Sequence, residues 1–111
     1  MEKILSALAE PNRLKIVELL REQRLTVGEI AEQLQIRQPQ ASKHLKVLSE
    51  AGLVDVHPVA NQRIYELRAE PFKELDTWIA SYRNIMNERF DRLDDYLKEL
   101  QSQEIDKSNK Q

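Results

Sequence analysis

One stretch of the chain, residues 33–49, combines amide, hydroxyl and basic side chains and contains no acidic residue. In a helix this stretch would bury Ala41, Leu45 and Leu48 on an inner face. Its outer face would carry side chains that can bond nucleic acid: Gln40, Lys43 and Lys46, with Gln38 and Ser42 on the flank. Glutamine can pair with adenine and lysine with guanine, while Ser42 and Lys46 can hold phosphates. An ordinary solvated helix face is the alternative that periodicity leaves open.

Two short helices joined by a tight turn are needed to position these side chains. Thr26 and Glu29 have the spacing of a capping box, so a helix is predicted from there to about Leu34. After a turn at residues 35–37, a second helix has Pro39 near its first turn and stops at Gly52. This is the spacing of a helix-turn-helix, whose second helix enters the major groove of DNA.

A β-hairpin is predicted directly after these helices. Residues 53–57 and 63–67 carry β-branched or aromatic side chains at alternate positions, and residues 58–61 indicate a loop. Strands this short must pack against the helices. We expect Arg63 of this wing to bind a phosphate or enter the minor groove, with a purely structural hairpin as the alternative. His57, just before the loop, is expected to be solvated.

Three further helices are predicted at residues 2–9, 11–23 and 71–100. In the last of these, apolar side chains recur every three or four residues. Thirty helical residues span about 45 Å, longer than a core this small can cover, so part of this stripe is expected to meet a second copy of the chain. The predicted dimer-interface residues are Phe72, Leu75, Trp78, Ile79, Tyr82, Met86, Phe90, Leu93 and Leu97.

The predicted fold is mainly α with a small β-hairpin wing, in the order α-α-α-α-β-β-α. Residues 1–70 are expected to form the winged helix-turn-helix domain, residues 71–100 the dimerisation helix and residues 101–111 a disordered tail. Only 2 Gly and 4 Pro in 111 residues, with 32% charged residues, favour helices over a multi-stranded sandwich. A net charge of −2 argues against a protein that coats nucleic acid without specificity.

The composition also excludes several classes of protein. The absence of Cys rules out disulfides, thiolate metal sites and a Cys nucleophile. No apolar run is long enough to span a membrane and no signal peptide opens the sequence, so a cytoplasmic protein is expected. The chain has no Gly-rich phosphate loop and only two His, which disfavours an enzyme.

Four stretches together resemble the ArsR/SmtB family of winged helix-turn-helix repressors: LSALAEPNRLKIVELL, LTVGEIAEQL, PQASKHLKVLSEAGLV and RIYEL. They cover roughly residues 1–70 in the order the family has them. The resemblance implies a prokaryotic homodimer with terminal helices at its interface, bound to a palindromic operator. It places Gln38, Gln40, Ser42, Lys43 and His44 in the DNA-facing stretch and Arg63 at the basic wing position. Asp55 and Ala60-Asn61 depart from the more basic, Gly-containing wing of many relatives.

The same resemblance allows the family's metal sites to be checked. Thr26 and Gly28 stand where many metal sensors of this family carry two Cys, and the last helix has no His between Pro71 and Leu100. Carboxylates alone on a solvated face are poor zinc ligands. The last helix instead resembles the metal-free branch, so no metal site and no cofactor are expected.

The sequence therefore predicts a sequence-specific DNA-binding repressor that acts as a homodimer on double-stranded DNA. A small-molecule or protein effector stays open. The alternative is a protein-interaction module that uses the long helix and has lost its affinity for DNA.

Overall fold

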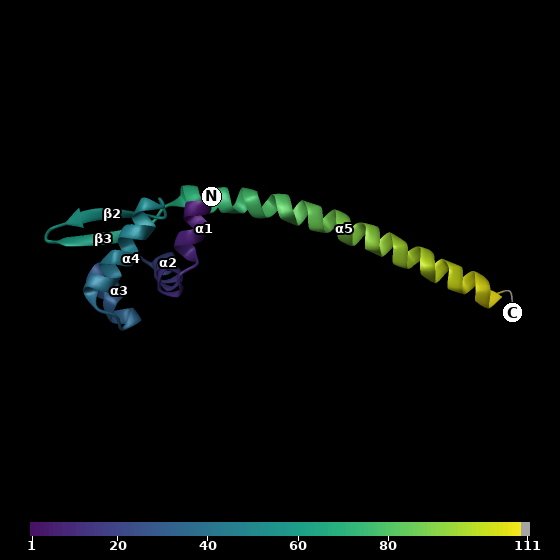
Figure 1. Cartoon of the computed structure of the whole chain (residues 1–111), viewed down its shortest axis with the longest axis horizontal. Helices are drawn as coiled ribbons and strands as arrows, with labels where there is room; N and C mark the ends of the chain where they lie inside the picture. The colour runs from purple at the N-terminus through teal and green to yellow at the C-terminus, as the bar shows by residue number, and fades with distance from the viewer. Residues whose placement is uncertain (110–111) are drawn as a thin grey trace. The chain divides into compact units, whose positions relative to one another are not determined.

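The computed structural model of the chain describes residues 1–109, with side chains described as far as Ile105. It contains five helices and three strands in the described part: α1 (Glu2–Leu8), α2 (Pro11–Glu22), β1 (Leu25–Thr26), α3 (Val27–Leu34), α4 (Gln38–Glu50), β2 (Val54–Val59), β3 (Gln62–Leu67) and α5 (Ala69–Asn109) (Figure 1). The predicted fold class, mainly helical with a small wing, is confirmed. The chain divides into two compact units, Met1–Leu75 and the residues from Asp76 onward.

The core of the first unit is formed by apolar side chains from every element before α5. Six large side chains are completely or almost completely buried: Ile16, Leu25, Ile30, Leu45, Leu48 and Leu53. Three of these, with Ala41, line the inner faces of α3 and α4, as the periodicity predicts. Phe72 and Leu75, in the first turns of α5, pack against the same core.

The sheet has one strand more than the sequence predicted. Strand β1 pairs antiparallel with β3, so that Leu25 lies opposite Tyr65, and the strand order is β1-β3-β2. Both of these side chains are buried. A strand of two residues is too short to show alternation, which is why periodicity missed it.

The predicted hairpin loop at residues 58–61 was too long. Strand β2 continues through Pro58 to Val59, and Val59 pairs with Gln62, so only Ala60 and Asn61 form the turn. Pro58 has no N–H to donate, but β2 lies at the edge of the sheet, where this loss is tolerated. Ala60 adopts a φ of 54° to close the turn.

The helix starts follow the local signals in the sequence. The Thr26–Glu29 capping box is confirmed: Glu29 N donates to Thr26 Oγ1 at 3.2 Å, and Thr26 N donates to Glu29 Oε1 at 3.0 Å. The hydrogen bond from the Thr26 backbone, followed by that with its side chain, lowers the pKa of the Glu29 carboxyl. Glu10 caps α2 in a similar way, since its Oε2 accepts from Arg13 N at 2.9 Å.

Two helix ends close with a left-handed residue and paired backbone bonds. Gly52, at φ 78°, follows α4, and Gly52 N and Leu53 N donate to the oxygens of Ser49 and Leu48. This is the Schellman arrangement expected of a glycine at that position. Gln35, at φ 56°, ends α3 with the same pair of bonds.

The last helix is longer than predicted at both ends. It begins at Ala69, with Pro71 in its first turn where the missing N–H costs nothing, and it runs to Asn109. The predicted helix end at Leu100 was therefore wrong, and residues 101–109 are helical where a disordered tail was expected. The reason is local, because no Gly or Pro follows Pro71 and residues 101–109 offer no other stop signal. Residues 110 and 111 lie outside the described part.

None of the described helices combines the length and the apolar character that a membrane span requires.

Substitution by Ala should have opposite effects on the free energy of unfolding at the two glycines of the chain. Gly52→Ala should lower the free energy of unfolding by about 1–2 kcal/mol, because a residue with a Cβ pays that in the left-handed region. Gly28→Ala should raise it by about 0.5–1 kcal/mol, because Gly28 lies in α3 and glycine is the poorer helix former. Space does not distinguish the two sites, since the nearest atom to an added Cβ is 3.9 Å away at Gly28 and 4.0 Å away at Gly52. Urea unfolding at one fixed protein concentration measures both, and changes of the same sign would contradict the assignment.

Candidate nucleic-acid interface

Helices α3 and α4 are held at a fixed geometry by the turn between them. The turn is Gln35-Ile36-Arg37, as predicted. Its first residue is left-handed, and Ile36 packs against the core between the two helices. Because Ala41, Leu45 and Leu48 are fully buried, α4 cannot rotate about its axis. Its outer face is therefore fixed.

This outer face carries the predicted DNA-facing side chains. Gln38, Gln40, Ser42, Lys43 and Lys46 are all exposed. No carboxylate lies in α4 before its last residue, Glu50. The first three turns of the helix thus present amides, a hydroxyl and two ammonium groups to a partner.

Gln40 has a second role that the sequence did not predict. Its Oε1 accepts a hydrogen bond from Arg37 N at 3.1 Å, which closes the N-terminus of α4. Arg37 has no side-chain acceptor to return the bond, so Gln40 alone performs this cap. A base contact by Gln40 would have to share or replace this bond.

His44 does not lie with the other predicted contacts. Its side chain is only 21% exposed, and its Nδ1 lies 3.7 Å from Glu10 Oε2 at the N-terminus of α2. The structure therefore places His44 between α4 and α2, while its neighbours Lys43 and Lys46 are exposed.

Three predicted residues from two elements meet in one hollow. Ser42 and Lys46 of α4 and Arg63 of β3 line a depression of about 390 Å³. Its other lining residues are Val27, Leu45, Ser49, Glu50, Val56 and Tyr65. The lining thus includes two cationic side chains, three hydroxyl-bearing side chains and one carboxylate. This balance suits a phosphate group, which needs positive charge and hydrogen-bond donors.

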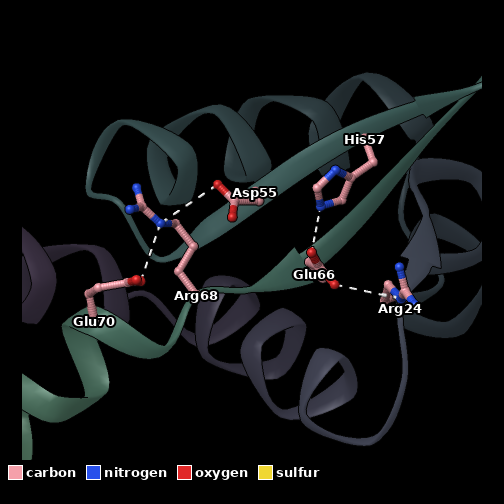
Figure 2. Close-up of polar contacts among 6 residues, drawn as sticks. All are labelled: Arg24, Asp55, His57, Glu66, Arg68 and Glu70. Atoms are coloured by element: carbon pink, nitrogen blue, oxygen red, sulfur yellow. Dashed lines mark hydrogen bonds and ion pairs between the residues drawn. The ribbon is translucent and has the colours of Figure 1, made fainter.

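The two faces of the hairpin differ in chemistry. Arg63 and Tyr65 point to the side of α4, whereas Asp55, His57 and Glu66 lie on the opposite face. His57 Nε2 lies 2.5 Å from Glu66 Oε1, and Arg24 lies at the second oxygen of Glu66 (Figure 2). His57 is exposed, as expected, but it also contacts Glu66 across the hairpin, which the sequence did not predict.

Sequence reasoning missed this polar cluster for a structural reason. Asp55 lies directly opposite Glu66, and only the register of β2 on β3 brings them together. The alternation of Asp55 and His57 on one strand was a signal, but it does not identify the cross-strand partner.

The predicted dimer residues fall into two groups. Phe72 and Leu75 pack on the core of their own chain. The remaining seven are exposed, from 38% for Trp78 to 66% for Phe90. Ile85, Tyr96, Leu100 and Ile105 add further exposed apolar surface to α5.

Known proteins share this architecture. Residues 8–57 match a family model described as a helix-turn-helix domain. The transcriptional repressor SdpR of Bacillus subtilis is 30% identical over 84 residues, which cover 76% of this chain and 93% of SdpR. Several other curated relatives match over only about half of their own length.

Solved structures agree with the sequence relatives. A crystal structure of an ArsR family transcriptional regulator superposes with a TM-score of 0.72 at 27% identity, over 78% of this chain and 94% of that one. The homodimeric winged helix-turn-helix DNA-binding domain of Mb0332 from Mycobacterium bovis gives 0.62 at 25% identity, over 75% and 77%. These relatives are transcriptional regulators and not enzymes. By its sequence and its fold, this chain belongs to the ArsR family of winged helix-turn-helix transcriptional regulators.

Proposed function

We propose that this chain is a transcriptional repressor that binds a palindromic operator as a homodimer and needs no metal cofactor to do so. It represses by occupying the operator and blocking polymerase in the cytoplasm of a prokaryote. Relatives whose names describe them as repressors, SdpR among them, support this direction of regulation.

The observation that carries the proposal is the position of Ser42, Lys46 and Arg63 around one hollow beside the exposed face of α4. A helix that enters the major groove must have the DNA backbone running along its flank. The hollow offers that backbone two cations and three hydroxyls. With the phosphates held there, Gln38, Gln40 and Lys43 near the start of α4 are the side chains that reach base edges.

The homodimer follows from the exposed stripe on α5. Exposed apolar side chains recur along α5 from Trp78 to Leu100. Such a stripe is unfavourable in water and suits a second copy of the same helix. A two-fold dimer presents two copies of α4, which matches a palindromic site. A different protein on this stripe is the competing interpretation, and the oligomeric state decides between them.

The residue types in α3 and α5 support the proposal that DNA binding needs no metal ion. The chain has no Cys, and its two His are in α4 and β2, so α3 and α5 offer neither thiolate nor imidazole. The binding experiments below therefore use protein dialysed against EDTA, and loss of DNA binding on that treatment would contradict this part of the proposal.

The salt dependence of binding tests the phosphate contacts. Each phosphate contact contributes about 0.9 to the slope of log K against log salt, so Lys46→Ala should lower the slope by about two units in a dimer. Arg63→Ala should act in the same way. Fluorescence anisotropy with a duplex that the protein selects from a random pool measures both.

Lys15→Ala is the matched control, because Lys15 is also exposed but lies on α2 and does not line the hollow. It should leave the slope within experimental error of the unsubstituted protein. Equal effects of Lys15→Ala and Lys46→Ala would show that only total charge matters and that the hollow holds no phosphate.

Two substitutions at Gln40 separate capping from base reading. Gln40→Ala removes the acceptor for Arg37 N, so it should lower the free energy of unfolding by about 0.5–1 kcal/mol without DNA. It should also cost about 1–3 kcal/mol on the cognate site and relax preference at one base pair per half-site. Gln40→Glu keeps an acceptor for Arg37 N but has no donor for adenine, so it should retain stability and lose the base preference. A Gln40→Glu protein with unchanged base preference would remove Gln40 from the base readers.

One substitution on α5 tests the dimer. Phe90→Glu should raise the dimer dissociation constant roughly 100-fold or more, since two apolar side chains worth about 1.5–3 kcal/mol each leave the interface. Asn84→Glu adds the same charge on the opposite face of the helix and should leave the dimer intact. Sedimentation velocity at micromolar protein resolves the two states. A Phe90→Glu protein that remains dimeric, or an unsubstituted protein that is monomeric, rules out this interface.

A further inference from the structure

The outer face of the hairpin gathers three side chains that can donate to a metal ion. Asp55 and His57 are two residues apart on β2, so both point to the same face. Glu66 of β3 lies directly opposite Asp55 on that face. One ligand atom from each of Asp55, His57 and Glu66 lies within 4.8 Å of the other two (Figure 2).

One imidazole nitrogen and two carboxylate oxygens form a recognised donor set for a borderline divalent transition metal such as Zn²⁺. Three protein ligands leave further coordination positions to water, and the partly exposed side chains give an ion a path from solvent. We propose that Asp55, His57 and Glu66 form a binding site for such an ion, which joins β2 to β3 on the outer face of the wing.

The pairing of the strands supplies a second reason for a cation at this place. Two carboxylates directly opposite each other on an antiparallel pair repel and destabilise the pairing. Asp55 and Glu66 are such a pair. A divalent ion between them would turn this repulsion into a bridge across the hairpin.

The neighbouring arginines fit the role of outer-shell partners. Arg24 Nε lies 3.6 Å from Glu66 Oε2, and Arg68 Nε lies 3.6 Å from Asp55 Oδ1. Each of these contacts uses one oxygen of a carboxylate and leaves the other oxygen available to an ion. Contacts of this kind orient metal-binding carboxylates. An ion would replace the direct hydrogen bond between His57 and Glu66.

The proposed site is separate from the DNA-binding surface. None of its three residues lines the hollow of Ser42, Lys46 and Arg63, and Arg63 projects from the opposite face of the hairpin. It also lies outside α3 and α5, where metal sensors of the family carry their ligands. The ion would brace the wing without being required for operator binding, so this inference does not depend on the proposed function.

Isothermal titration of the full-length, EDTA-dialysed protein with zinc chloride alone tests the proposal. We expect one zinc ion per protomer at micromolar zinc, and a higher midpoint of thermal unfolding in its presence. His57→Gln should lower the zinc affinity at least about tenfold, and Asp55→Asn should do the same. His44→Gln, which alters the other histidine of the chain, should leave the affinity unchanged.

A second measurement keeps the test independent of any effect of the substitutions on folding. The two histidines give two sets of imidazole signals in the NMR spectrum of the unsubstituted protein, and zinc should shift those of His57 while leaving those of His44 in place. The proposal is overturned by any of three results: no binding at micromolar zinc, binding that His57→Gln leaves unchanged, or a shift of the His44 signals alone.

Discussion

The burial of one face of α4 is the constraint on which the rest of the site depends. Ala41, Leu45 and Leu48 have no exposed surface, and they pack in the same core as Ile30 of α3 and Leu53 at the start of the hairpin. A helix anchored along one face has only one face left for solvent. Because this packing fixes the helix, Lys43 and Lys46 are exposed and Lys46 lines the same hollow as Arg63.

Local signals in the sequence predicted most of the helical architecture. The capping box at Thr26 and the left-handed Gly52 each involve residues within five positions of one another, so the pattern contains the whole interaction. Long-range features escaped it. Strand β1 exists because Leu25 pairs with Tyr65, forty residues later, and the contact of His44 with Glu10 depends on how α4 packs on α2.

The candidate site was predictable to the same extent. The spacing of the apolar residues predicted the exposed face of α4, because the face opposite a buried apolar stripe is left to solvent. It gave neither the cap formed by Gln40 nor the cluster of Asp55, His57 and Glu66, because the first depends on a side-chain rotamer and the second on strand register. The hairpin thereby carries two unlike surfaces. One is cationic and shared with α4, and the outer one has paired acids and a histidine, with Arg24 and Arg68 beside them (Figure 2).

The proposed function requires that the exposed face of α4, presented twice by a dimer, reads a specific DNA sequence. Selection of bound duplexes from a random pool by the purified full-length protein tests this most directly. We expect enrichment of one pseudo-palindrome, with two half-sites related by the two-fold axis of the dimer. A pool that shows no enriched sequence after repeated rounds, although the protein is folded and dimeric, would contradict it.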